Sequence, residues 1–129
     1  MPVPELNNAL KGVAAITGVG HSDYVQDYKA VRAGEKPHDS FGYAAIAFKR
    51  ALEDAGIDKS EIDGLISGPT TAHERMSEVL GIDPDWGVQA DAMMGIQAGI
   101  MAIHSGMCEV VALVYGNNQR SAAVNYGGS

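Results

Sequence analysis

The stretch Val88-Gln-Ala-Asp-Ala-Met-Met-Gly-Ile-Gln-Ala-Gly-Ile-Met-Ala-Ile-His-Ser-Gly-Met-Cys-Glu-Val-Val-Ala-Leu-Val-Tyr-Gly116 decides the fold. It joins an apolar helix, a turn at a glycine and a hydrophobic strand without a break, which is half of a parallel α/β unit. Gly95 and Gly99, with Ala98 and Ala102, leave one side of the helix almost without side chains, so that another part of the backbone can approach closely. We therefore expect this helix to be buried on most of its sides.

Composition and charge limit the class of protein. The chain has 129 residues, 46% of them hydrophobic, which suits one domain over residues 1–129 with a packed core. Its 16 acidic residues against 9 scattered basic ones give a net charge of -7, which argues against nucleic-acid binding. The one cysteine cannot form an internal disulfide, and neither a leader peptide nor an apolar run of membrane-spanning length is recognisable. We expect a soluble, cytoplasmic protein with no membrane span.

Short apolar runs and helical periodicities alternate along the chain. The clearest helix begins where Asp39 or Ser40 can cap it and ends at Gly56, which is suited to a left-handed terminating position. A short helix is expected over residues 71–80, and strands over residues 11–19, 62–68, 83–88 and 109–115. Residues 21–39 show no clear period and are interpreted as a long surface loop. Four strands and three main helices in alternation predict a parallel sheet with helices on both faces.

Three motifs in sequence order resemble the amino-terminal part of the thiolase superfamily. They are Ala51-Leu-Glu-Asp-Ala-Gly-Ile57, Ile62-Asp-Gly-Leu-Ile-Ser-Gly68 and Ala102-Ile-His-Ser-Gly-Met-Cys-Glu-Val-Val111. More narrowly, Val111-Ala-Leu-Val-Tyr-Gly-Asn-Asn-Gln-Arg-Ser121 is similar to the sterol-carrier or lipid-transfer branch, whose members act on acyl-CoA thioesters. The resemblance implies a three-layer α/β/α thiolase-like half with an incomplete sheet of about four strands and three main helices.

The same resemblance implies how the sheet continues and assembles. In that fold a fifth, antiparallel strand lies between the first and the fourth. The expected strand Lys11 to Val19 therefore lacks its neighbour in this chain, and its backbone N–H and C=O groups are left unpaired on that side. The 129 residues are therefore not expected to be an autonomous stable fold of this architecture. The resemblance also implies a homodimer, in which the strand near Trp86 to Val88 pairs across a two-fold axis, and an OB-fold partner protein associated with acyl-CoA.

The resemblance further implies a position for the catalytic nucleophile. In thiolases a cysteine lies at the start of the buried helix, where backbone N–H groups and the helix dipole favour a thiolate. Counting back from Gly106 places that position within a couple of residues of Gln89, yet Gln89, Ala90, Asp91 and Ala92 include no cysteine. The resemblance extends to enzymes of the same branch that cleave steroid side-chain β-hydroxyacyl-CoA substrates by retro-aldol chemistry, without a cysteine at this position. That reaction needs a base and an oxyanion hole but no covalent thioester.

These features leave three functions open. The first is the amino-terminal segment of a cysteine-independent aldolase, a lyase of lipid or steroid degradation. The second is a 3-ketoacyl-CoA thiolase or acetyl-CoA acetyltransferase, and the third is a non-catalytic thiolase-like module that dimerises or binds a partner. Coenzyme A enters as part of the acyl-CoA substrate, and no separate cofactor is expected. We assign no catalytic residue, and we assign substrate binding to Asp91, Met93 and Met94.

Each candidate residue also has a plainer interpretation. Asp91 is better explained as a helix N-cap than as an acid or base, and Cys108 as a packed core thiol. The pair Gly18 and Gly20 is explained by a tight turn, since the third glycine of a dinucleotide fingerprint is missing. Four methionines could line an acyl channel, but packing in a core or subunit interface is favoured: Met93, Met94, Met101 and Met107. The histidines lack paired spacing, so no metal site is expected: His21, His38, His73 and His104.

Overall fold

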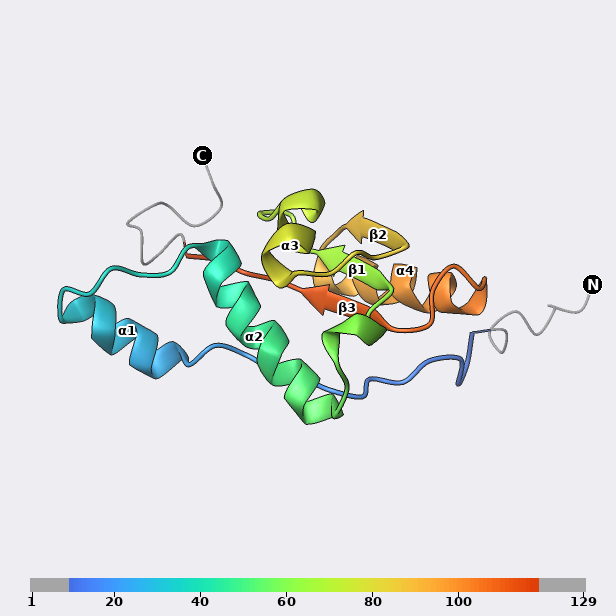
Figure 1. Ribbon diagram of the computed structural model, residues 1–129, viewed down its shortest axis with the longest axis horizontal. Helices are drawn as coiled ribbons and strands as arrows, with labels where there is room; N and C mark the ends of the chain where they lie inside the picture. Colours follow the sequence, from blue (N-terminus) through green and yellow to red (C-terminus); the bar gives the residue numbers. More distant parts are fainter. Residues whose placement is uncertain (1–9, 119–129) are drawn as a thin grey trace, which may run out of the picture.

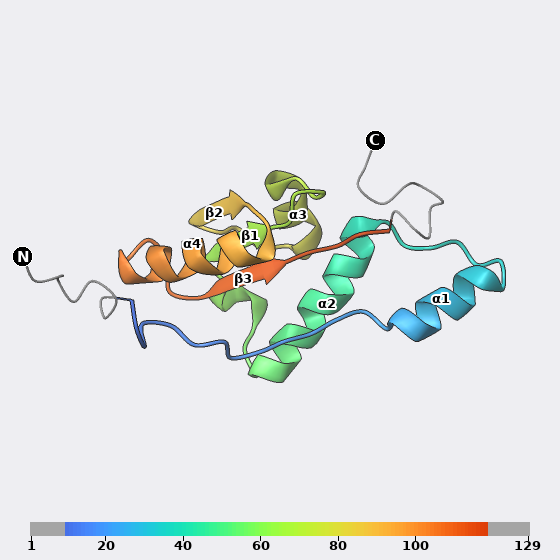
Figure 2. The same cartoon turned by 180° about the vertical axis from the view of Figure 1, so that it is seen from behind.

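A three-stranded parallel sheet in the order β2-β1-β3 forms the centre of the structure, a computed structural model that describes residues 10–118 (Figure 1). Helices α2 and α3 lie on one face of the sheet and α4 on the other, as the two views show (Figures 1 and 2). The elements are α1 (Tyr24–Arg32), α2 (Ser40–Ala55), the 3-10 turn η2 (Lys59–Glu61), β1 (Gly64–Ser67), α3 (His73–Leu80), β2 (Trp86–Gln89), α4 (Ala92–His104) and β3 (Val111–Val114). This arrangement confirms the three-layer α/β class.

The central strand β1 holds the two helical layers together. Side chains of a strand point alternately to the two faces of the sheet, and here Leu65 belongs to the core beneath α2 and α3 while Ile66 lies under α4. Leu65 is completely buried and Ile66 is 1% exposed, so β1 is covered on both faces as a parallel strand requires. The core on the α2 and α3 side consists of Ala44, Phe48, Ile62, Leu65, Met76, Leu80 and Val114.

Helix α2 confirms the clearest prediction from the sequence. The Asp39 side chain accepts a hydrogen bond from the backbone N–H of Gly42 at 2.7 Å, which caps the first turn. Gly56 ends the helix with φ of 69°, a left-handed conformation that costs a glycine little. The buried face of the helix includes Ala44 and Phe48, so local signals and packing agree here.

Helix α4 lies on the sheet with its small-residue side, as its sequence suggests, but against side chains rather than another backbone. A Cβ atom at Gly95 would lie 2.9 Å from Ile66 Cγ2 and 3.0 Å from Leu113 Cδ1, and one at Gly99 would lie 3.3 Å from Ile66 Cδ1. The expectation that α4 is buried on most sides is wrong for this chain. Its other side is solvent-facing, because no element within residues 10–118 covers it, and exposes Met93, Met94, Ile96 and Met101.

The expected first strand over residues 11–19 is not formed. This segment runs as irregular backbone across α2 (Figure 2), and Ile16 and Val19 are 77% and 69% exposed. A strand needs a ladder partner, and the N–H of Val19 instead donates to Asp54 Oδ2 on α2 at 2.9 Å. Gly18 lies so close to the helix backbone that a Cβ there would be 2.5 Å from the carbonyl oxygen of Ala51. The glycine thus serves a close approach rather than a turn after a strand.

The expected loop over residues 21–39 contains a helix, α1, so that residues 10–118 form one main helix more and one strand fewer than expected. Asp23 caps α1 by accepting a hydrogen bond from the N–H of Gln26. Tyr24, Tyr28 and Val31 do recur at helical spacing, but α1 buries no residue, and the surrounding polar side chains obscure the period. The polar tail expected beyond Asn118 lies outside the described residues.

None of the helices within residues 10–118 combines the length and the apolar character needed to cross a bilayer. Helix α4, the most apolar of them, has 13 residues.

Substitutions in α4 test the contact between its glycines and the sheet. We expect Gly95→Leu to lower the free energy of unfolding by about 1–3 kcal/mol, because the new side chain must displace the buried Ile66. Gly99→Leu should cost less, since its space is wider, and Gln97→Leu on the exposed side should change little. Urea unfolding of the purified proteins measures all three. Equal stability of the Gly95 and Gln97 variants would show that α4 is not seated as described.

The Asp63 side chain links the amino-terminal ends of β1 and β3, and this link gives a second prediction. Its carboxylate accepts hydrogen bonds from the N–H groups of Glu109 and Val110 at 2.8–3.0 Å. Asp63→Ala leaves both donors without this partner and should lower the free energy of unfolding by about 1–3 kcal/mol. Asp83→Ala, at an exposed carboxylate, is the matched control and should stay within about 0.5 kcal/mol of the parent in the same urea titration. A large effect in the control would contradict this assignment.

Candidate functional site

The carboxyl ends of the three strands meet at one edge of the sheet, which is the usual position of binding sites in open α/β folds. Three turns lie there, formed by residues 68–71 after β1, residues 90–91 after β2 and residues 115–118 after β3. Helix α4 also begins at this edge, because it follows β2 directly. This edge is therefore the candidate site.

Hydrogen bonds join the three turns into one surface. Thr70 Oγ1 donates to the carbonyl oxygen of Gly116 at 3.0 Å, which links the turns after β1 and β3. Gln89 Nε2 donates to the carbonyl oxygen of Pro69 at 3.2 Å, and the N–H of Ala90 donates to that of Ser67 at 2.9 Å. The turn after β2 is therefore held against the turn after β1 by both side-chain and backbone contacts.

The start of α2 closes the same edge beside β3. The Ser40 hydroxyl donates to Asn118 Oδ1 at 3.2 Å, and Asn118 Nδ2 donates to the carbonyl oxygen of His38 at 3.2 Å. The ring of Tyr115 lies against Gly68, and its hydroxyl accepts a hydrogen bond from Asn117 Nδ2 at 2.9 Å. These polar groups, none of which the sequence had singled out as a site, come together only because β1 and β3 are neighbours.

The start of α4 contains the residues expected at the nucleophile position. Asp91 is the N-cap, and its Oδ1 accepts a hydrogen bond from the N–H of Met94 at 2.9 Å, which confirms the capping interpretation. A carboxylate at this position also interacts favourably with the positive end of the helix dipole. Met93 and Met94 are 76% and 64% exposed and flank the cap, so the structure places the three expected substrate-binding residues together. Their role in binding stays a prediction.

Cys108 lies at the opposite edge of the sheet from the start of α4. It follows α4 and precedes β3, so the 13 residues of the helix, about 20 Å at 1.5 Å per residue, separate it from Asp91. The thiol is buried, and burial is the main cause that raises its pKa, with the charges of Asp63 and Asp85 adding to the effect. A thiol of this kind is a packed core residue rather than a nucleophile, as the sequence suggested.

The histidines do not form a metal centre. Within residues 10–118 no three His, Cys, Asp or Glu side chains are grouped so that they could hold a metal ion. His21 stacks on Tyr24, and His38 meets the ring of Tyr43 edge-on. Both histidine rings are therefore packed against tyrosine rings.

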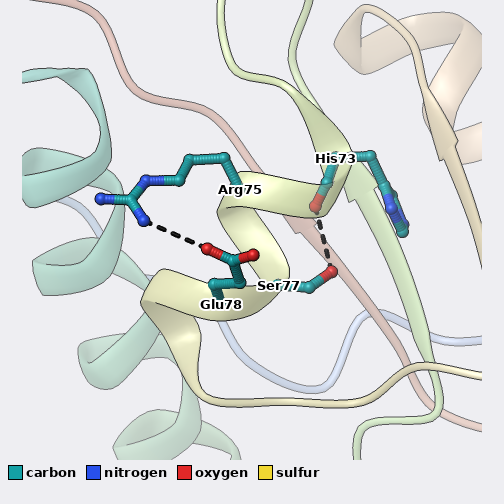
Figure 3. Close-up of polar contacts among 4 residues, drawn as sticks. All are labelled: His73, Arg75, Ser77 and Glu78. Carbon is teal, nitrogen blue, oxygen red and sulfur yellow. Dashed lines mark hydrogen bonds and ion pairs between the residues drawn. The ribbon is translucent and has the colours of Figure 1, made fainter.

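The burial of two polar groups on the α3 side of the sheet was not predicted from the sequence. Ser67 Oγ and His73 Nε2 are both buried without a hydrogen-bond partner in the described structure. Figure 3 shows the His73 ring pointing away from the exposed ion pair of Arg75 and Glu78, while its carbonyl accepts a hydrogen bond from Ser77. The ring lies over Gly87, where a Cβ would overlap it. A glycine within a strand was the available signal for this close approach.

Comparison with known proteins gives one relative in sequence and several in structure. No protein-family model matches the chain. A "Steroid side-chain-cleaving aldolase" of Thermomonospora curvata is 28% identical over 128 residues, which cover 93% of this chain and 30% of that protein. The chain thus spans about a third of the length of this curated relative.

The structural relatives share the fold. An "Ltp2-ChsH2(DUF35) aldolase" matches with a TM-score of 0.64 and 26% identity, over 81% of this chain and 28% of that chain. OleA of Xanthomonas campestris matches with a TM-score of 0.64 and 16% identity, over 84% of this chain and 46% of that one. An SCP2-thiolase-like protein of Mycobacterium smegmatis matches with a TM-score of 0.56 and 21% identity, over 76% and 22%. The chain is thus similar in sequence to part of a steroid side-chain-cleaving aldolase, and in fold to part of thiolase-like proteins.

Proposed function

We propose that this chain contributes the β2–α4 part of the site in an enzyme that cleaves a carbon–carbon bond of a β-hydroxyacyl-CoA by retro-aldol chemistry. The observation that carries the proposal is the start of α4, where Asp91 caps the helix and no thiol is present. The one cysteine of the chain is buried at the other edge of the sheet. The name of the relative, "Steroid side-chain-cleaving aldolase", agrees with this chemistry.

The reaction needs no covalent bond to the enzyme. A base removes the proton of the β-hydroxyl group, the bond between Cα and Cβ breaks, and a carbonyl forms at Cβ. The electron pair of the broken bond passes into the thioester and forms an enolate, which hydrogen-bond donors stabilise. Transfer of a proton to Cα then converts the enolate to the shorter acyl-CoA. The products are a ketone or aldehyde and an acyl-CoA, with coenzyme A carried as part of the substrate.

The residues at the start of α4 have chemistry suited to holding such a substrate. Met93 and Met94 offer exposed, flexible apolar surface to an acyl group, and Gln89 offers an amide beside them. Capping by Asp91 fixes the direction of the first turn of the helix. In this proposal these groups bind and orient the substrate.

Ordinary thiolase chemistry is the weaker alternative, because it requires an acyl-enzyme on a cysteine at the start of this helix. A purely structural module is the third alternative. The assembly named Ltp2-ChsH2(DUF35) supports the further proposal that the protein containing this chain binds a DUF35 partner, so enzymatic experiments should keep any polypeptide that copurifies.

The proposal predicts cleavage without an acyl-enzyme. We expect the purified protein, with its copurifying partner, to convert a steroid β-hydroxyacyl-CoA to a ketone and a shorter acyl-CoA. Liquid chromatography with mass spectrometry detects both products, and intact-protein mass spectrometry should show no added acyl group.

Cys108→Ala is the matched control for this experiment. It should retain the rate of cleavage, because the thiol is about 20 Å of helix away from the start of α4. An acyl adduct on the parent protein that disappears in this variant would contradict the proposal and favour a thiolase. Absence of any turnover together with tight partner binding would favour the structural module.

The outer edge of β2 carries a prediction about assembly. The N–H groups of Trp86 and Ala90 donate toward β1, so by alternation that of Gln89 points to the outer edge. If two copies pair there, as we propose, Gln89→Pro removes one donor and should shift the dimer toward monomer. Gln89→Ala keeps the donor and should remain dimeric. Light scattering over a concentration series measures the mass, and a monomeric parent protein would refute the pairing.

A further inference from the structure

A depression of about 440 Å³ lies between α1, the first turn of α2 and the turn after β3. Its volume falls within the range of about 300–1,000 Å³ that is usual for small-molecule sites. It is lined by Ser22, Tyr24, Asp27, Tyr28, Val31, Arg32, Tyr43 and Asn117. The lining is therefore rich in aromatic rings, which come from two helices, and it contains both an acidic and a basic side chain.

Neighbouring side chains hold the tyrosine rings in place. Tyr24 stacks on His21 with 5.2 Å between the ring centroids, and Tyr43 meets His38 edge-on at 5.3 Å. Tyr43 is 9% exposed, so it forms a fixed wall on the α2 side. Tyr24 and Tyr28 lie one turn apart on the same side of α1 and are 69% and 59% exposed. The rings are thus oriented by contacts and still accessible to a ligand.

The position of Arg32 shows that a cation fits on one of these rings. Its guanidinium carbon lies over the ring of Tyr28, 5.8 Å from the centroid, which is within the distance of about 6 Å that is usual for cation–π contacts. The hydrogen bond from Arg32 Nη1 to the Tyr28 hydroxyl is 3.4 Å long, beyond the ordinary range of about 2.7–3.2 Å. Because Arg32 is also exposed to solvent, it can leave the ring at little cost.

The Asp27 carboxylate belongs to the same lining and is half-buried. Within residues 10–118 the one ion pair joins Arg75 to Glu78, so Asp27 has no cationic partner in that part of the chain. A carboxylate that is partly withdrawn from water interacts more strongly with a nearby positive charge than a fully solvated one does. The net charge of -7 over the chain also attracts cations rather than anions.

We propose that this depression binds the quaternary ammonium group of a small organic cation, as found in choline. The faces of aromatic rings carry negative potential, which stabilises a cation that is too bulky to be held by hydrogen bonds. The tyrosines form the walls and Asp27 supplies the opposite charge. Arg32 moves into solvent when the ligand takes its place over Tyr28. The inference does not depend on the proposed aldolase activity.

Other ligands match the lining less well. An anion would meet a single guanidinium and would be repelled by Asp27. An aliphatic chain would find one aliphatic side chain, Val31, among the lining residues. A protein partner that covers the tyrosines of α1 is the competing occupant, because tyrosine and arginine are frequent in interfaces. That occupant predicts no preference for a small cation over a neutral molecule of the same shape.

Saturation-transfer NMR with choline tests the site on the full-length protein, since this method detects weakly bound small molecules. The matched control is the neutral isostere of choline in which carbon replaces the nitrogen atom. We expect saturable binding of choline and about fivefold weaker binding of the isostere, which corresponds to about 1 kcal/mol. Equal binding of the two compounds, or no saturable signal from choline, would overturn the proposal.

Two substitutions of Tyr28 test the contact with the aromatic ring. Tyr28→Phe keeps the ring and loses only the long hydrogen bond to Arg32, so it should bind choline at least as tightly as the parent. Tyr28→Leu removes the ring but keeps an apolar side chain that favours helices, and it should weaken binding about fivefold. Asp27→Asn should also weaken binding, because it removes the opposite charge. Equal affinities of the two Tyr28 variants would refute the cation–π contact.

Arg32→Gln tests the displacement. This variant removes the competing charge from the ring and should bind choline about threefold more tightly. Lys29→Gln removes a positive charge from the same helix outside the lining, and at physiological salt it should change the affinity less than about twofold. Weaker binding of choline by Arg32→Gln, or an equal gain in both charge variants, would contradict the assignment of Arg32 as the group that the ligand replaces.

Discussion

The contact of α4 with β1 and β3 is the constraint on which the rest of the structure depends. Ile66 of the central strand reaches into the space that Gly95 and Gly99 leave open, so the helix axis comes close to the sheet. Larger residues at those positions would lift the helix and separate its first turn from the carboxyl edge. The position of Asp91, Met93 and Met94 at that edge thus follows from two residues without side chains.

The carboxyl edge owes its chemistry to parallel pairing. Because β1 lies between β2 and β3, the turns after all three strands are neighbours, although they are separated by up to about fifty residues in sequence. Thr70 reaches Gly116, and Gln89 reaches Pro69, across these distances. The opposite edge contains the buried Cys108 and the carboxylate of Asp63, whose contacts are structural. In our proposal the substrate binds at the carboxyl edge of this small sheet, whereas the contacts at the opposite edge are structural.

Two regions of exposed apolar surface, on α4 and on α1, differ in character. On α4 it consists mainly of methionines and an isoleucine, which adapt to many shapes, and it continues the buried glycine side of the same helix. On α1 it consists of tyrosines around a depression with a fixed wall. Flexible side chains suit a variable or extended contact, whereas rigid rings suit a ligand of defined shape.

Local signals in the sequence determined α2, the carboxyl-terminal half-unit from α4 to β3, and the capping role of Asp91, because caps, terminating glycines and helical periods act over a few residues. They also determined that the start of α4 has no thiol. Tertiary structure alone decided that residues 11–19 run across α2 as irregular backbone, since an apolar run becomes a strand only when a neighbour completes its hydrogen bonds. It likewise brought Tyr43 of α2 to the same depression as Tyr24 and Tyr28 of α1, which no spacing in the sequence indicates. Contacts between distant segments depend on how the layers pack, and that information is not written in any single stretch of the chain.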